Sequence, residues 1–284
     1  MSAVEDKTIV VADGIGLHAK IYAGGPKTPA VCLHGLTRNE SDFELLAPKV
    51  AATGRDVIAL TMRGRGRSSY DPDYLNYHPL TYRDDVLKAM DAAGIEKAIF
   101  IGTSLGGIVS MLTNEAAPDR VAAAIINDVG PELAVEGITR IAGYAGKTKT
   151  QVADINEAAA EIRAVNGVAF PGADEDFWLM FARRTFRENA DGSWTLAYDP
   201  NIGKALTEVG PAPDMWGPWA SLKNMPTLLI RGALSDLLSP AIVEKMRSAH
   251  PNFDYAEVPN VGHAPTLTEP EAWNAIESFQ NQLG

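Results

Sequence analysis

Residues 97–110 read KAIFIGTSLGGIVS. The segment 98–101 is apolar at every position, which is typical of a strand buried on both faces of a sheet. Residues 104–115 have a helical pattern, so Ser104 lies where a predicted strand turns into a predicted helix. Glycines precede and follow it, at positions 102, 106 and 107. A small polar residue in so tight a turn calls for a chemical or a structural reason.

The alternation of strand and helix patterns extends along the chain. Eight β-rich runs occur, at residues 8–11, 19–23, 29–35, 55–62, 97–103, 122–130, 226–232 and 253–260, and the turn DGIG at 13–16 predicts a hairpin between the first two. Helical patterns occur at 43–52, 82–93, 240–249 and 271–282. Such alternation implies parallel strands joined by right-handed crossovers. The sequence therefore predicts an α/β fold with a doubly wound, mostly parallel eight-stranded sheet.

The alternation is interrupted between the sixth and the seventh predicted strands. Residues 131–222 contain helical patterns but no buried strand run, and they hold four of the five tryptophans. An aromatic-rich helical insertion at this point is typical of a lid over a binding site, and a helical layer without a binding role is the alternative. We predict a core formed by residues 1–130 and 223–284, with a helical cap formed by residues 131–222.

Composition and charge exclude several classes of protein. The 284 residues carry a formal net charge of −11, and such a surface repels nucleic acid and anionic lipid. No run of about 18 apolar residues occurs and the N-terminus has no secretory pattern, so we expect a soluble, cytoplasmic protein without a membrane span. The single cysteine, Cys32, excludes an internal disulfide and a thiolate metal cluster. No metal site is expected.

The turn around Ser104 has the G-x-S-x-G pattern of a nucleophile elbow. In such a turn the serine takes a strained backbone conformation, and a side chain two residues before or after it would clash, so glycine is required at both places. The strain exposes the hydroxyl at the N-terminus of a helix, where backbone N–H groups favour negative charge. We predict that Ser104 is a catalytic nucleophile, with a helix-capping serine as the alternative.

A serine nucleophile needs a base, and His263 is the predicted one. It lies in the loop PNVGHAPTLTEP after the last strand, so it reaches the same carboxyl edge of the sheet as Ser104. The base in turn needs a carboxylate that orients it. Asp236, in the loop after the seventh strand, is the first choice, and Asp128, at the end of the sixth strand, is the alternative.

An oxyanion that forms during attack on a carbonyl needs N–H donors. The Leu105 N–H, directly after the nucleophile, is the first predicted donor. The second is expected from the loop LHGLTRNE after the third strand, where Gly35 lets the backbone turn its amides toward the site. We choose the Leu36 N–H for this role, with the Thr37 N–H as the alternative.

Taken together, these motifs resemble the α/β-hydrolase family, in the form that carries a helical cap. The resemblance covers nearly the full length and depends on His34-Gly35, MRGRGRSS at 62–69, the elbow at 102–107, Asp236 and Gly262-His263. The order Ser, Asp, His is the order that this family uses. The resemblance implies a serine hydrolase that forms an acyl-enzyme intermediate and uses no cofactor.

The expected substrate is a small carboxylic ester or lactone, with its apolar part held by cap aromatics such as Trp178, Phe181 and Trp216. A carbon–carbon bond hydrolase of meta-cleavage-type products is an alternative. The elbow of those enzymes usually carries Asn before the serine, where this chain has Thr103. A non-catalytic receptor for a small ligand is the alternative from another class, and the intact Ser–Asp–His set gives it no support.

Basic residues in the cap bear on the charge of the substrate. The segment RRTFR places Arg183, Arg184 and Arg187 where they could meet an anionic group. A solvated basic face of a helix is the interpretation that we favour for them.

Overall fold

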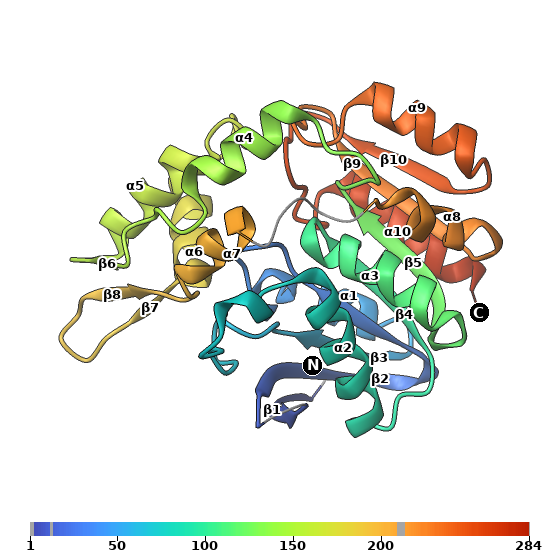
Figure 1. Ribbon diagram of the computed structural model, residues 1–284, viewed down its shortest axis with the longest axis horizontal. Helices are drawn as coiled ribbons and strands as arrows, with labels where there is room; N and C mark the ends of the chain where they lie inside the picture. The colour runs from blue at the N-terminus through green and yellow to red at the C-terminus, as the bar shows by residue number, and fades with distance from the viewer. Residues whose placement is uncertain (1–2, 12–13, 209–213, 284) are drawn as a thin grey trace.

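The computed structural model describes residues 3–11, 14–208 and 214–283 (Figure 1). Within these residues the chain forms a seven-stranded sheet with helices packed on it, and a smaller lobe stands to one side (Figure 1). The strands of the large sheet are β1 (Val4–Val10), β2 (Gly16–Leu33), β3 (Arg55–Leu60), β4 (Ala98–Thr103), β5 (Val121–Asn127), β9 (Thr227–Gly232) and β10 (Asp254–Val258). The predicted turn at 13–16 includes Asp13, which lies outside the described residues.

The large sheet is mostly parallel. Its strand order is β1-β2-β4-β5-β9-β10, and β3 pairs with β2 beside this path. β1 and β2 are antiparallel, and the pairs β2–β4, β4–β5, β5–β9 and β9–β10 are parallel. The carboxyl ends of these parallel strands therefore meet at one edge, which is where ligands bind in open α/β sheets.

Seven strands are found in place of eight because the predicted second and third strands are two halves of one strand. β2 passes β3 twice, so that Ala19 and Leu33 both lie opposite Leu60. The register against β3 shifts repeatedly between Ala19 and Ala30. The strand bends between these two halves and continues along the other edge of β3. No helix or loop interrupts it, so the two predicted runs belong to one strand.

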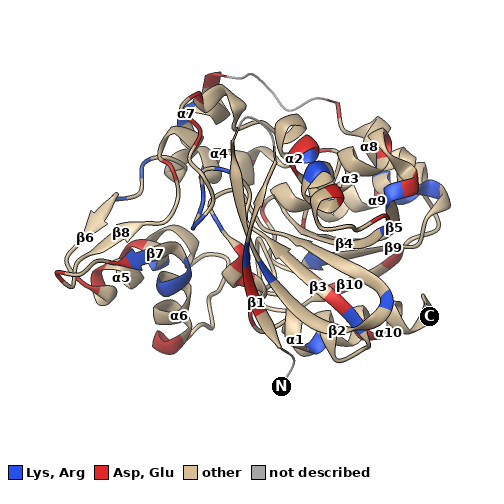
Figure 2. Cartoon of the chain, turned by 90° about the horizontal axis from the view of Figure 1, so that it is seen from below, with Lys and Arg blue, Asp and Glu red and all other residues tan. Residues whose placement is uncertain are grey.

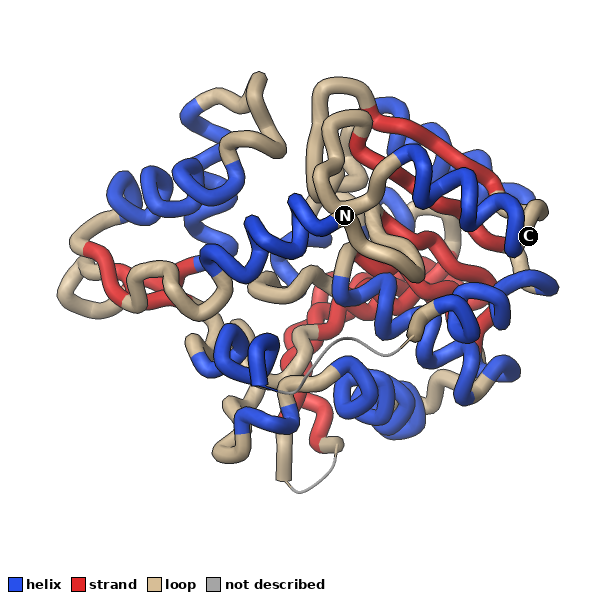
Figure 3. The backbone as a smooth tube through the Cα atoms, turned by 45° about the horizontal axis from the view of Figure 1, so that its top comes forward, coloured by secondary structure: helices blue, strands red, loops and turns tan. Residues whose placement is uncertain are grey.

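Helices cover both faces of this sheet (Figure 3). They are α1 (Ala47–Ala51), α2 (Pro79–Ala92), α3 (Leu105–Ala116), α9 (Pro240–Ala249) and α10 (Pro270–Gln282), with short 3-10 helices η1 (Glu40–Phe43), η2 (Tyr74–Asn76), η3 (Pro118–Arg120) and η4 (Leu222–Asn224). Alternate residues of β4 serve opposite faces: Ile99 and Ile101 pack in the cluster that contains α1 and α10, and Phe100 packs with α2 and α3. The continuous apolar run of β4 follows from this two-sided burial.

The smaller lobe is formed by the chain between β5 and β9 (Figure 1). Its elements are α4 (Val135–Tyr144), β6 (Gln151–Val152), α5 (Ile155–Asn166), α6 (Glu175–Thr185), β7 (Phe186–Glu188), β8 (Trp194–Leu196) and α7 (Asn201–Glu208), and the segment ends in α8 (Trp216–Ser221), which lies on the core. The small antiparallel sheet β6-β8-β7 was not predicted, because strands of two or three residues give no alternating pattern. The last helix, α8, packs on α3 of the core, where Trp219 contacts the cluster that holds Met111.

Charged residues lie on the helices, the loops and outer strands such as β1 and β10, and β4 and β5 carry none (Figure 2). No helix in the described part of the chain is long and apolar enough to cross a membrane.

Candidate active site

Ser104 joins the end of β4 to the start of α3. Its backbone angles, φ 52° and ψ −115°, lie in a region that a residue with a side chain rarely adopts. A Cβ on Gly102 would lie 2.4 Å from the Gly106 carbonyl oxygen, and a Cβ on Gly106 would lie 2.0 Å from the Leu33 carbonyl oxygen. Glycine at position 102 therefore lets the start of α3 pack on the end of β4, and glycine at position 106 lets the turn pack directly against β2. Ser104 itself lines a cavity at the carboxyl edge of the sheet.

The Ser104 hydroxyl lies within hydrogen-bonding distance of an imidazole. His263, in the loop between β10 and α10, has its Nε2 2.9 Å from Ser104 Oγ. Its Nδ1 is 2.9 Å from Asp128 Oδ2. A neutral imidazole that donates its Nδ1–H to a carboxylate presents the Nε2 lone pair to the hydroxyl. The structure thus brings together two of the three residues preferred from the sequence, Ser104 and His263.

The carboxylate that contacts His263 is Asp128, the alternative, and the choice of Asp236 is corrected. Asp236 follows β9 as predicted, but its two oxygens accept hydrogen bonds from Arg140 Nε at 2.5 Å and Arg140 Nη2 at 2.8 Å. These bonds with the Arg140 guanidinium lower the pKa of the Asp236 carboxyl. Asp236 therefore joins the core to α4 of the lobe, and its oxygens are turned to that partner.

Hydrogen bonds of its backbone and side chain hold Asp128 in position beside His263. Its φ is 58°, and its N–H donates to the Ile230 carbonyl at 2.8 Å. Its Oδ1 accepts the Gly232 N–H at 3.0 Å, so each carboxylate oxygen has a partner although the residue is fully buried. Burial of a carboxylate is tolerated when its hydrogen bonds are satisfied in this way.

Asn127, which the sequence reasoning missed, connects the loops of the site. Its Nδ2 donates to Thr103 Oγ1 at 3.1 Å and to the Pro265 carbonyl at 2.8 Å. Its own carbonyl accepts the Ser104 N–H at 2.9 Å. Asn127 thereby fixes the elbow relative to the loop that carries His263. The polar pair at the end of the apolar run AAAIIND is the sequence signal that points to it.

The two predicted oxyanion donors are available. Among the described residues, no acceptor is found for the N–H of Leu36 or of Leu105, nor for that of the alternative, Thr37. Leu36 and Thr37 line the same cavity as Ser104. Leu105 is the first residue of α3, where an N–H has no partner within the helix.

His34 fixes the direction of the Leu36 N–H. Its Nδ1 lies 2.7 Å from the Gly35 carbonyl oxygen, and its Nε2 accepts the Met62 N–H at 2.9 Å. Burial lowers the pKa of His34 to about 4, so the ring is neutral and donates through Nδ1. Because the carbonyl and the N–H of one trans peptide point in opposite directions, the Leu36 N–H is turned away from His34.

The cavity lies between the sheet edge and the lobe. The sheet side contributes Ser104, His263 and the loop that contains Leu36, and the lobe contributes Ile141, Ile162 and Phe181 among others. Of the three cap aromatics predicted to hold the substrate, Phe181 lines the cavity, and Trp178 and Trp216 do not.

Each of these tryptophans has another environment. Trp178 is 1% exposed and packs against the rings of Phe170, Phe177 and Phe181. Trp216 donates its Nε1–H to Glu132 at 3.2 Å. Spacing along a helix gives the relative direction of side chains but not which face meets the cavity, and this is why the expectation for both was wrong.

The three arginines of RRTFR also differ in whether they line the cavity. Arg183 and Arg187 are exposed, as a solvated face requires, whereas Arg184 is buried and lines the cavity.

Comparison with known proteins identifies relatives along the whole chain. A family model described as "Alpha/beta hydrolase family" matches residues 30–276. A 3-hydroxybutyrate-oligomer hydrolase of Cupriavidus necator is 32% identical over 267 residues, which cover 90% of each protein. A 2-(acetamidomethylene)succinate hydrolase of Mesorhizobium japonicum is 25% identical over 93% of this chain and 91% of its own.

The comparison with solved structures also finds an alpha/beta hydrolase. The crystal structure of an alpha/beta hydrolase from Novosphingobium aromaticivorans superimposes with a TM-score of 0.91, at 39% sequence identity and with 99% of both chains covered.

Proposed function

Because this chain belongs to the alpha/beta hydrolase family, we propose that it hydrolyses a small carboxylic ester or lactone through an acyl-enzyme intermediate. The observation that carries the proposal is the hydrogen-bonded series Ser104–His263–Asp128 at the edge of a cavity. In this proposal residues 131–222 act as the cap, and the substrate binds between the cap and the sheet.

The first half of the reaction is acylation. His263 Nε2 takes the proton of the Ser104 hydroxyl as Oγ attacks the carbonyl carbon of the ester. The negative oxygen that results is held by the N–H groups of Leu36 and Leu105. The imidazolium is stabilised by Asp128 and gives its proton to the leaving alcohol, so the C–O bond breaks and Ser104 carries the acyl group.

The second half is deacylation. A water molecule loses a proton to His263 and attacks the acyl carbon, and the same two N–H groups hold the second oxyanion. The proton then returns to Ser104 Oγ, and the carboxylic acid leaves. Asp128 keeps the Nδ1–H of His263 in place during both halves, and Asn127 keeps the two loops in register.

One of the relatives supports ester cleavage. The hydrolase of C. necator is named for oligomers of 3-hydroxybutyrate, and the units of such hydroxy-acid oligomers are joined by carboxylic ester bonds. This is the bond class that we assign to the present chain.

The decisive experiment replaces the nucleophile. We expect Ser104→Ala to lower the hydrolysis of p-nitrophenyl acetate at least about 10³-fold, with the melting temperature within a few degrees of that of the unaltered protein. Ser248→Ala, at an exposed serine of α9, is the matched control and retains full activity. A fluorophosphonate should label the unaltered protein and the control but not Ser104→Ala.

Two other outcomes would redirect the proposal. No turnover and no labelling of the unaltered protein would favour a non-catalytic receptor. A large preference for a meta-cleavage dienone over short-chain esters, measured side by side, would favour carbon–carbon cleavage.

A further inference from the structure

Arg184 is a buried cation beside the candidate nucleophile. It lies in the last turn of α6 and is 8% exposed, and it lines the cavity that Ser104 and His263 line. A guanidinium in such a place normally has a carboxylate or several acceptors around it, because an unpaired buried charge costs several kcal/mol.

In the part of the chain that the structure describes, the Arg184 guanidinium donates no hydrogen bond, and its Nε is buried without a partner. The charges of Asp42 and Glu44 act on Arg184, but among the described residues the ion-pair contact is with Glu44 alone, whose Oε2 is 4.0 Å from Arg184 Nε. Glu44 is already paired with Lys20 Nζ at 2.6 Å. Burial lowers the pKa of Arg184, which reflects the cost of this poorly compensated charge.

Arg38, a second arginine of the same cavity, has the opposite character. Its Nε donates to Asp42 Oδ2 at 2.9 Å, and its Nη1 donates to Thr185 Oγ1. Its guanidinium carbon lies 3.8 Å from the centre of the Phe181 ring. Arg38 is therefore neutralised by Asp42 and fixed between the sheet side and α6, which leaves Arg184 as the cation of the cavity without a matching anion among the described residues.

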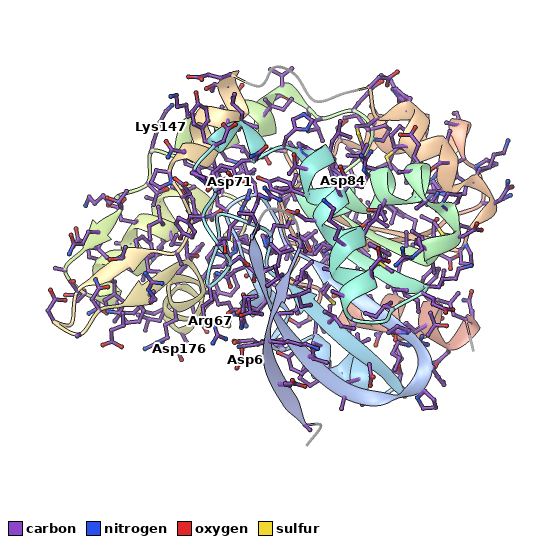
Figure 4. The ribbon with its side chains drawn as sticks, turned by 60° about the horizontal axis from the view of Figure 1, so that its bottom comes forward. Asp6, Arg67, Asp71, Asp84, Lys147 and Asp176 are labelled. Atoms are coloured by element: carbon purple, nitrogen blue, oxygen red, sulfur yellow. The ribbon has the colours of Figure 1, made fainter. Side chains whose placement is uncertain are left out.

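Arg184 also borders a groove on the outside of the cavity, which we call the outer groove. Its charged residues are Lys20, Glu40, Arg67, Asp154, Arg183, Arg184, Arg187 and Glu188. Arg67 is paired with Asp6 of β1 (Figure 4), and no ion pair is found for Arg183 or Arg187 within the described residues. The outer groove therefore holds charges of both signs, and Arg184 is the residue that it shares with the cavity of Ser104.

We infer that Arg184 binds a carboxylate carried by the substrate, so that the preferred ester or lactone has a second, ionised acid group away from the bond that is cleaved. This inference rests on the proposed function for the bond itself. The two oxygens of the bound carboxylate accept hydrogen bonds from the Arg184 guanidinium. Arg184 is therefore paired with an anion only while a substrate with this carboxylate is bound. Neutral esters of the same shape leave Arg184 unpaired.

The test compares charged and neutral esters of one acid. Monomethyl and dimethyl esters of succinic, glutaric and adipic acid are assayed by proton release with the unaltered protein, Arg184→Gln and Arg184→Lys. We expect kcat/KM for the best monomethyl ester to fall 10- to 100-fold in Arg184→Gln, mainly through KM, and to be partly restored in Arg184→Lys. The dimethyl esters should change less than about threefold, and the control Arg183→Gln should change neither class.

A binding measurement separates this inference from the proposed function. In Ser104→Ala, calorimetry with monomethyl glutarate should detect binding that is lost in the double variant Ser104→Ala, Arg184→Gln. If the unaltered protein hydrolyses none of these esters and this binding is still found, the proposed function fails and the carboxylate site stands. If esters are hydrolysed but Arg184→Gln leaves the ratio of charged to neutral rates unchanged, the carboxylate site is overturned and the hydrolase stands.

A purely structural role for Arg184 has its own signature. Arg184→Gln would then melt several degrees lower and would slow both ester classes equally, and this result also overturns the inference. We expect the melting temperature of Arg184→Gln to be equal or higher, because the variant removes a buried charge without a partner.

Discussion

Ser104 and Asp128 follow neighbouring strands, and both have a positive φ, 52° and 58°. In each case the backbone beyond the strand is tied to the next strand: the Ser104 N–H donates to the Asn127 carbonyl, and the Asp128 N–H donates to the Ile230 carbonyl. The two strained turns are therefore held by the extension of the sheet ladder past the ends of the strands. Strain of this kind persists where surrounding hydrogen bonds determine the backbone, which is characteristic of catalytic positions.

The assignment of the acid is tested by two substitutions of equal size. Asp128→Asn should lower kcat about 10²- to 10⁴-fold, because an amide at this position cannot favour the required tautomer of His263 or stabilise its cationic form. Asp236→Asn should leave kcat within about threefold, since Asp236 hydrogen-bonds to Arg140. Steady-state kinetics with one ester decides the matter, and the reverse pattern would restore Asp236 as the acid.

At this scale the sequence identified Ser104 and His263 because each has a local context that explains it, a glycine-flanked turn and a loop at the carboxyl edge. It could not choose between Asp128 and Asp236 on geometry. Both residues follow buried strands that end at the same edge, so their positions along the chain are equally suitable. The difference lies in Arg140, a residue of the lobe that engages Asp236, and no pattern in the sequence connects those two.

Among the elements, α3 and β2 are in close contact at Gly106. The elbow allows α3 to start immediately beside β2, the strand that precedes the Leu36 loop, so the two proposed N–H donors belong to segments that meet at the elbow. This contact is possible because Gly106 has no side chain.

Gly106→Ala is expected to disrupt that contact. The added methyl would lie 2.0 Å from the Leu33 carbonyl oxygen, which belongs to a buried strand and cannot move away cheaply. We expect a loss of about 2–4 kcal/mol in the free energy of unfolding, or a failure to fold, and at least a 10-fold loss of activity in any folded protein. Urea unfolding followed by circular dichroism measures the effect.

Gly143→Ala is the matched control for this change. A Cβ at Gly143, in α4, meets no atom within 4 Å, so the substitution should stabilise the protein by up to about 1 kcal/mol through helix propensity. Equal stability of the two variants would contradict the tight packing that we describe at the elbow.

The elements of the core were predictable because long apolar runs have one explanation in a parallel sheet, burial on both faces. The lobe was predictable only as an insertion with helices. Three features could not be predicted: its small sheet, the buried position of Trp178 and the packing of α8 on α3. They depend on contacts between short segments, and short segments have no periodic pattern from which such contacts could be predicted.

For the molecule as a whole, the N-terminal strands and η1 meet at a buried carboxylate, Glu40. Its Oε1 lies 3.3 Å from His18 Nδ1, and its Oε2 accepts a hydrogen bond from Thr61. Burial alone would raise the pKa of Glu40, but the neighbouring His18 imidazole and the hydrogen bond from Thr61 outweigh it and lower the pKa from 4.5 to about 2. A carboxyl whose pKa is lower in the folded state stabilises that state above its unfolded pKa.

The stability contributed by Glu40 should therefore be complete above about pH 4.5 and be lost as the pH falls toward 2. We expect Glu40→Gln to flatten the fall in the free energy of unfolding over this interval, by an amount on the order of 3 kcal/mol. Denaturant titrations at several pH values between 2.5 and 6 measure the slope. Glu5→Gln, at an exposed position of β1, serves as the control, and an identical slope in both variants would refute the role of Glu40.

The lobe and the loop of His263 also meet backbone to backbone. The Gly262 N–H donates to the Ala169 carbonyl at 2.6 Å, and a Cβ on Gly262 would lie 2.8 Å from the Ala169 Cα. A foreign insertion grafted onto this scaffold to alter its substrate range would thus also change the backbone contact that supports the loop of His263, the proposed base. Such chimeras should succeed only when the segment around Ala169 is retained or transplanted together with the turn that it abuts.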